Sequence, residues 1–464
     1  MNQRWTLHIE NFARIESADV EISPLMCFIG DNNSGKSYVM SLLWGIMSNE
    51  EFFFDSVHTE LESYTDCKEF ILSHVDKRVM LNDKVARMYL EFFNDLLSTC
   101  KDELVQKIFN HAIPIGKIEI RNFTFAEKLP LRIKRSEKKA RISFEHRLVR
   151  DLNLLESDVG EQADRNYMGI SLPVSDEYLE VALWRANVGI VFNLIMMDWL
   201  FADSTITFAT PIYLPASRTG FLMTYSQIAS NSVRSFFSAD SDIRSLQGTL
   251  TLPYIQFLQL LIELKDSETS DVEAHKDLIN FIRSEILHGT IRVKNDGRLI
   301  RYQASDMREE LPLSVTSSVV TEIASLLLLL TTKIPLRLVV IEEPEAHLHP
   351  ALQKKIAQLL VRFVHSGIPI WITTHSDTIL QHFNNMIKLN NRLEDEREEL
   401  LKEFGYTDKD LLTPEEINLY QFERGVSHTT ITKLVAGKYG FKATSFNEAI
   451  DSLAREIFSF QEDE

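Results

Sequence analysis

Gly30-Asp31-Asn32-Asn33-Ser34-Gly35-Lys36-Ser37 decides the fold class of this chain, because it matches the pattern G-x-x-x-x-G-K-S at every fixed position. An apolar run at residues 25–29 precedes it and predicts a buried strand, and residues 38–44 follow with a helical pattern. Strand, glycine-rich loop and helix in this order are typical of a phosphate-binding loop, whose backbone N–H groups and helix N-terminus face phosphate oxygens.

The residues of this loop have separate expected roles. Lys36 is expected to reach the β- and γ-phosphates of a nucleotide, and the Ser37 hydroxyl is expected to coordinate magnesium. The other positions expected to line the nucleotide site are Gly30, Asn32, Asn33, Ser34 and Gly35.

A second motif lies 300 residues further along the chain and reads Arg-Leu-Val-Val-Ile-Glu-Glu-Pro at residues 337–344. Its four consecutive apolar residues predict a strand buried on both faces, as in a parallel sheet. Open α/β sheets bind ligands at the carboxyl ends of such strands. Glu342 is suited to the magnesium shell, directly or through water, and Glu343 is suited to polarise an attacking water.

Composition indicates a large intracellular enzyme. The chain has 464 residues, enough for two or three domains, with 44% hydrophobic and 25% charged residues. Its three cysteines have no metal or redox spacing, which favours a reducing compartment. The N-terminus does not resemble a signal peptide, and no apolar run is long enough to span a bilayer. We therefore expect a cytoplasmic protein without a membrane partner.

One segment departs from the acidic character of the chain, whose formal net charge is −18. Residues 132–150 contain eight Lys or Arg and two Glu, and they predict a hairpin that turns near residues 136–139. One interpretation is a contact with a nucleic-acid backbone. The other is a solvated edge hairpin kept soluble by its cations. The cations of the first interpretation are Arg132, Lys134, Arg135, Lys138, Lys139 and Arg141.

Three further segments carry a resemblance to a known family. Thr373-Thr374-His375-Ser376 ends an apolar strand and resembles the switch histidine segment of ABC-type ATPases. Residues 341–350, Ile-Glu-Glu-Pro-Glu-Ala-His-Leu-His-Pro, resemble the motif of OLD-type ATPases, which are similar to the heads of SMC proteins and of double-strand-break-repair ATPases. Residues 213–220, Tyr-Leu-Pro-Ala-Ser-Arg-Thr-Gly, resemble a segment that recurs in the same branch.

The resemblance implies an α/β fold: an ABC-type P-loop ATPase head with a mixed or parallel sheet core, an antiparallel β subdomain and a large helical insertion. It implies ATP and Mg²⁺ as cofactors, with Glu343 and His375 as catalytic residues. His347 and His349 have no third ligand at a sensible spacing, so a separate metal site is not expected.

The signature loop departs from the family pattern. ABC-type heads donate a leucine–serine–glycine–glycine loop across a head-to-tail dimer, and here the matching stretch is residues 316–322. The resemblance implies that Ser317 binds the γ-phosphate in trans. Val319 stands at the second glycine position, where a β-branched side chain restricts backbone approach. Hydrolysis is therefore expected to be slow, or the loop to move.

These motifs predict a split nucleotide-binding core made of residues 1–50 and 335–390. Residues 51–205 are expected to form the helical insertion with the basic hairpin, and residues 206–334 a lobe with a strand and the signature helix. Residues 391–464 are expected to form a C-terminal helical region. Residues 290–303 predict a hairpin that turns at Asn295-Asp296-Gly297.

Fewer than 90 residues follow His375, too few for the TOPRIM nuclease of full-length OLD proteins, so no nuclease activity is expected in this chain. The chain resembles the ATPase subunit of Septu-type, retron-associated or PARIS anti-phage systems. This implies an oligomeric sensor or scaffold that controls a separate nuclease effector. The alternative is an SMC-like DNA-repair or chromosome-maintenance ATPase that acts directly on DNA. A transporter motor is disfavoured by the long insertion between the motifs.

Overall fold

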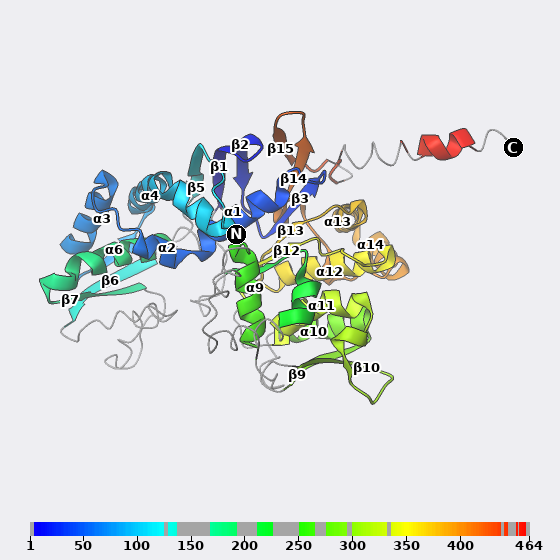
Figure 1. Ribbon diagram of the computed structural model, residues 1–464. Coiled ribbons are helices and arrows are strands. Elements are labelled where there is room, and N and C mark those ends of the chain that lie inside the picture. Colours follow the sequence, from blue (N-terminus) through cyan, green and yellow to red (C-terminus); the bar gives the residue numbers. More distant parts are fainter. Residues whose placement is uncertain are drawn as a thin grey trace, which may run out of the picture.

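The computed structural model describes residues 4–124, 129–136, 168–192, 211–225, 250–264, 275–294, 299–331, 336–437, 440–443, 452 and 454–460. These residues form a large mixed sheet, two smaller sheets and helices around them (Figure 1). The α/β class expected from the sequence is confirmed, as are the mixed sheet core and an antiparallel β subdomain.

The central sheet has nine strands in the order β5-β1-β2-β15-β14-β3-β13-β12-β8. The strands β14, β3, β13, β12 and β8 run parallel, whereas β1 pairs antiparallel with both β5 and β2, and β15 pairs antiparallel with β14. The strand bounds are Arg4–Phe12 (β1), Ile15–Glu21 (β2), Leu25–Gly30 (β3), Lys117–Thr124 (β5), Ile212–Leu214 (β8), Val339–Glu342 (β12), Ile370–Thr373 (β13), Ile417–Arg424 (β14) and Thr429–Leu434 (β15).

The sheet therefore includes strands outside the segments assigned from sequence to the nucleotide-binding core. Strand β5 comes from the expected insertion, β8 from the expected signature lobe, and β14 with β15 from the region expected to be helical. The reason is pairing at long sequence separation: β14 lies directly beside β3, with Leu419 opposite Cys27.

Both faces of the parallel strands are covered, as their continuous apolar runs require. Side chains of β3 alternate between two cores: Met26 and Phe28 pack with α1 (Lys36–Ser48), whereas Cys27 and Ile29 pack with α12 (Pro350–His365) and α13 (Asp377–Asn390). Because successive strand residues point to opposite faces, one short strand supplies both cores.

A lobe at the left of Figure 1 carries the helices of the expected insertion. Its helices are α2 (Glu50–Asp55), α3 (Glu62–Ser73), α4 (Asp83–Phe109), the short η2 (Asp176–Tyr178) and α6 (Leu179–Ile190). The long helix α4 begins where the Asn82 side chain accepts hydrogen bonds from the N–H groups of Lys84 and Val85.

The basic segment lies partly in this lobe. Strand β6 (Leu129–Ser136) is the middle strand of a three-stranded sheet, between β4 (Arg78–Leu81) and β7 (Met168–Pro173). Its described part is therefore a central strand and not the edge hairpin of the sequence analysis. The expected turn, the return strand, and Lys138, Lys139 and Arg141 lie outside the described residues.

A second lobe, at the lower right of Figure 1, carries an antiparallel sheet of order β11-β10-β9. Thr290 pairs with Gln303, which confirms the hairpin expected over residues 290–303, although its turn lies outside the described residues. The elements are α9 (Leu252–Ile262), α10 (Lys276–Phe281), η6 (Ile282–Leu287), β9 (Gly289–Lys294), β10 (Leu299–Ala304), β11 (Leu311–Pro312), η7 (Leu313–Val315) and α11 (Ser318–Thr331).

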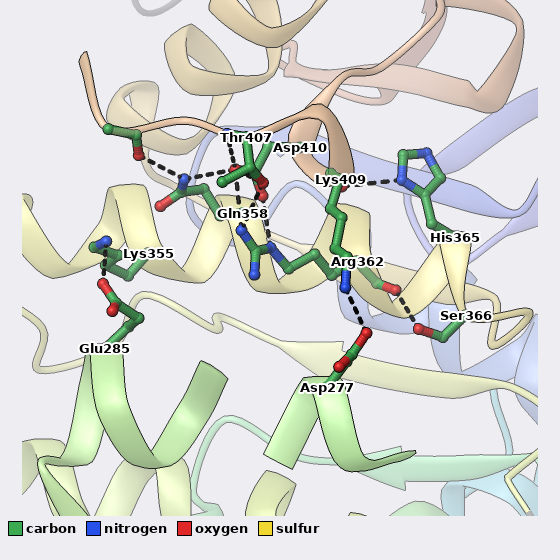
Figure 2. Close-up of polar contacts among 11 residues, drawn as sticks. Asp277, Glu285, Lys355, Gln358, Arg362, His365, Ser366, Thr407, Lys409 and Asp410 are labelled. Atoms are coloured by element: carbon green, nitrogen blue, oxygen red, sulfur yellow. Dashed lines mark hydrogen bonds and ion pairs between the residues drawn. The ribbon is translucent and has the colours of Figure 1, made fainter. Parts of the chain in front are cut away.

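Helix α12 joins this lobe to the segment after α14 (Glu394–Phe404) (Figure 2). The buried carboxylate of Asp410, in η8 (Asp408–Asp410), accepts hydrogen bonds from Arg362, Gln358 and Thr407. About one turn earlier on α12, Lys355 donates to Glu285 at 2.7 Å. No helix among the described residues has the length and hydropathy needed to cross a membrane.

Candidate nucleotide-binding site

The loop between β3 and α1 has the backbone that its glycines predict. Gly30 has φ 128°, and a Cβ atom there would lie 2.1 Å from the Phe422 carbonyl oxygen of β14. Gly35 has φ 98° and precedes α1, whose N-terminus has no side-chain cap. Because the first N–H groups of a helix need partners, this uncapped end fits a phosphate group.

Lys36 spans the loop from the first turn of α1. Its Nζ atom donates to the carbonyl oxygens of Gly30 at 2.9 Å and Asp31 at 2.7 Å. The side chain is buried, and this burial lowers the pKa of Lys36 to about 8. Among the remaining loop residues Ser34 is buried, whereas Asn32, Asn33 and Ser37 are exposed. A buried cation enclosed by a turn of backbone fits a polyphosphate.

Glu342, the last residue of β12, is buried, and both of its carboxylate oxygens accept hydrogen bonds. Tyr213 of β8 donates its hydroxyl to Oε1 at 2.8 Å, and the backbone N–H of Ala216 donates to Oε2 at 3.0 Å. The Tyr213 hydroxyl also lies 3.2 Å from the Ser41 hydroxyl, one turn beyond Ser37 in α1. Each carboxylate oxygen keeps a further lone pair with which it can accept another donor or bind a cation.

The backbone leaves the extended geometry of β12 at Glu343, the residue that follows the end of this strand. Glu343 has a φ of 45°, its side chain is 42% exposed, and its Oε1 atom lies 3.7 Å from Nε2 of His375. Burial and the nearby Lys36 cation lower the pKa of His375, while Glu343 and the Gly30 carbonyl act in the opposite direction. The carboxyl ends of β3, β12 and β13 thus bring Lys36, Glu343 and His375 together.

Glu345 follows the paired glutamates and was not among the residues expected to form the nucleotide site. Its Oε1 atom accepts hydrogen bonds from the Thr374 hydroxyl at 2.7 Å and from the His375 N–H at 2.8 Å. Burial raises the pKa of this carboxyl. Glu345 therefore fixes the backbone that carries the histidine. The only sequence signal was its place within the quoted glutamate motif.

Ser317 makes no described hydrogen bond to the phosphate loop of its own chain. It is exposed immediately before α11. Val319 is half-buried and packs against the core that contains β12. This packing gives the valine a structural role at the position where the family pattern has glycine.

The two histidines of the motif are also engaged within the protein. His347 Nδ1 lies 2.8 Å from Oε1 of Glu322, and the His349 ring caps α12 by accepting from the Ala351 N–H at 3.3 Å. Within the described part of the chain, no cluster of three or more His, Cys, Asp or Glu is arranged to hold a metal ion.

Two family models match separate parts of the chain. Residues 6–155 match the "AAA ATPase domain", and residues 224–381 match the "AAA domain, putative AbiEii toxin, Type IV TA system". The first segment contains the phosphate loop, and the second contains Glu342, Glu343 and His375. A search of the curated proteins finds no match.

Solved structures with some likeness include three SMC heads. An SmcHead bound to the C-winged helix domain of ScpA has a TM-score of 0.36 and 8% identity, over 93% of this chain and 97% of that chain. The SMC head domain from Thermotoga maritima has a TM-score of 0.34 and 9% identity, over 94% and 99%. An Smc head with an extended coiled coil, bound to the C-terminal domain of ScpA derived from Pyrococcus furiosus, has a TM-score of 0.34 and 8% identity, over 97% and 98%.

At these TM-scores the likeness to SMC heads carries no argument about activity or partners. The two matched sequence segments hold between them the loop and the acidic strand end that meet in the structure. They support a P-loop ATPase of the AAA type.

Proposed function

We propose that the chain binds and hydrolyses ATP. The observation that carries this proposal is the meeting of Lys36, Glu343 and His375 at the carboxyl ends of three adjacent parallel strands. Lys36 and the loop N–H groups hold the phosphates, and Glu343 orients and polarises the attacking water. His375, held by Glu345, contacts the γ-phosphate. Ser37 and Glu342 would hold Mg²⁺, which supplies charge neutralisation on the phosphates when bound.

The assembly we propose is a homo-oligomer, a head-to-tail dimer or larger, in which ATP lies between two copies. Ser317 is exposed at the start of α11, where it can reach the γ-phosphate of a second copy. Val319 restricts the approach of the backbone, so that hydrolysis is slow and bound ATP acts largely to hold the copies together.

The biological role we propose is that of an ATPase subunit in a prokaryotic antiviral defence complex in the cytoplasm. It would act as a sensor or scaffold that controls a separate nuclease subunit. The support is the resemblance of residues 341–350 and 213–220 to the branch of the OLD-type ATPases, together with the resemblance of the chain to the ATPase subunits of such systems. The second candidate is an SMC-like DNA-repair or chromosome-maintenance ATPase that acts directly on DNA. It is favoured by the cations Lys134 and Arg135 on β6, which would contact the phosphates of a nucleic-acid backbone.

Glu343→Gln tests the catalytic assignment, because it keeps the size of the side chain and removes the charge that polarises water. We expect ATP binding within about threefold of wild type, a turnover reduced at least about 100-fold, and more of the ATP-bound oligomer. A matched control is Glu398→Gln on the exposed helix α14, which should leave all three unchanged. Turnover unchanged in Glu343→Gln would refute the catalytic role.

Co-expression with the neighbouring genes separates the two biological roles. The complex is purified with ATP and its mass is measured. A nuclease subunit that assembles with wild type supports the defence role, and a recombination protein or DNA alone supports the repair role.

A further inference from the structure

Arg218, in the first helical turn after β8, is a buried arginine whose contacts converge on the backbone around Glu343. Its side chain is 2% exposed. Nη1 donates to the Glu342 carbonyl at 2.7 Å, and Nη2 donates to the Glu343 carbonyl at 3.1 Å. One planar guanidinium therefore holds the two carbonyl groups that flank the Cα atom of Glu343.

That backbone has a conformation which needs support. A φ of 45° places Glu343 in the left-handed region, which is uncommon for residues other than glycine. Such a residue persists only where its surroundings fix it. The Glu343 N–H donates to the Thr373 carbonyl of β13 at 2.8 Å. With the two carbonyls bound by Arg218, every polar group around the Glu343 Cα is held, and so is the direction in which its side chain leaves the chain.

The charge of Arg218 is compensated from a different element. Glu322, one turn into α11, is 1% exposed and forms an ion pair with Nη2 at 2.9 Å. The other oxygen of Glu322 accepts from the Thr219 hydroxyl at 2.6 Å and lies 2.8 Å from His347 Nδ1. The helix that begins beside Ser317 is thereby tied through one carboxylate to the turn after β8 and to the loop after Glu343.

We propose that Arg218 is a positioning residue for ATP hydrolysis, which holds the peptide groups of Glu343 so that its carboxylate points toward the nucleotide. Glu322 completes this arrangement and links it to α11, so that a shift of α11 when a second copy binds changes the position of the carboxylate. The proposal rests on the proposed ATPase function, but its effect on the backbone is independent of turnover.

Arg218→Lys is the informative change, because lysine keeps the charge beside Glu322 and loses the planar fork that binds two carbonyls. We expect kcat to fall roughly 10- to 100-fold, as misplacement of a reacting group by about 1 Å does. The KM for ATP should stay within about threefold, because Arg218 does not touch the phosphate loop. Arg185→Lys, at a half-buried arginine of α6 in the other lobe, is the control and should retain full turnover.

Hydrogen–deuterium exchange supplies a readout that does not require catalysis. In Arg218→Lys, peptides covering residues 338–348 should exchange faster, whereas peptides covering β3 and α1 should not change. In the background of Glu343→Gln, adding Arg218→Lys should reduce turnover no further, because the group that Arg218 positions is already lost.

Each outcome has one meaning. Turnover of Arg218→Lys within threefold of wild type, or reduced turnover with unchanged exchange at residues 338–348, overturns the proposal. A loss of ATP binding as large as the loss of kcat overturns it too, because that is the result of a general structural defect. Suppose that wild type itself hydrolyses no ATP while peptides covering residues 338–348 still exchange faster in Arg218→Lys. That pair of results supports the positioning of Glu343 and refutes the ATPase function instead.

Discussion

Lys36→Ala should remove most of the ATP affinity of the protein with little change in its stability without ATP. The lysine is buried in the turn of the phosphate loop, where its partners are two backbone carbonyls. Truncating one member of a buried charge pair typically costs about 2–4 kcal/mol of binding free energy. This predicts a dissociation constant for ATP that is raised about 30- to 1,000-fold.

The small effect on stability follows from two contributions that oppose each other. Burial lowers the pKa of Lys36 to about 8, because the charged form loses part of its hydration. The hydrogen bonds from this charged group to the two carbonyls offset part of that cost. We therefore expect the free energy of unfolding of Lys36→Ala to lie within about 2 kcal/mol of wild type.

Titration calorimetry with ATP and Mg²⁺ measures the affinity, and thermal unfolding with and without ATP measures the stability. ATP should raise the stability of wild type by an amount set by the ATP concentration relative to the dissociation constant. The same ATP concentration should raise the stability of Lys36→Ala only a little. Lys84→Ala, an exposed lysine at the start of α4, is the matched control. If the dissociation constant for ATP of Lys36→Ala lies within threefold of wild type, the assignment of this loop as the phosphate-binding site is wrong. A variant that is already unfolded without ATP would contradict the small effect on stability predicted here.

Three further predictions concern other parts of the molecule. Asp410→Ala leaves the Arg362 guanidinium without its buried partner, so urea unfolding should show a loss of about 3–5 kcal/mol, and Asp408→Ala, an exposed neighbour, should show much less. The hydrogen bond with Glu416 raises the pKa of His365; the stability that it contributes is fully present below the unperturbed pKa of about 6.5 and is lost as pH rises through the folded value. The melting temperature of wild type should therefore exceed that of His365→Gln by more at pH 6 than at pH 8, and an equal difference at both would contradict the pairing. Neutralising Lys134, Arg135, Lys138 and Lys139 should reduce the slope of log DNA affinity against log salt by about 3–4 units if they contact phosphates, and identical binding at every salt concentration would exclude that contact.

Local sequence signals predicted the parts of the fold that depend on local structure. The phosphate loop, the strands that end at Glu342 and Thr373 and the hairpin over residues 290–303 are all specified by apolar runs and glycine positions. Strand β14 was not predicted, because its buried residues include Asn418 and Gln421, which interrupt the apolar run. Its position beside β3 also explains Gly30, whose missing Cβ makes room for the Phe422 carbonyl. The sequence shows that glycine is present but not which segment approaches it.

The paired glutamates show most clearly where sequence reasoning ends. Glu342 and Glu343 are the same residue type at adjacent positions, and the different environments of their side chains depend on one backbone angle. Glu342 continues the strand, so its side chain is buried between Tyr213 and the Ala216 N–H. Glu343 adopts a left-handed φ, so its side chain turns to His375 instead. Arg218, which binds the backbone carbonyls of Glu342 and Glu343, lies more than 100 residues earlier in the chain. Its counterion, Glu322, lies on a third segment. A buried arginine that satisfies backbone carbonyls leaves no local pattern, because what specifies it is the tertiary position of groups that every residue possesses.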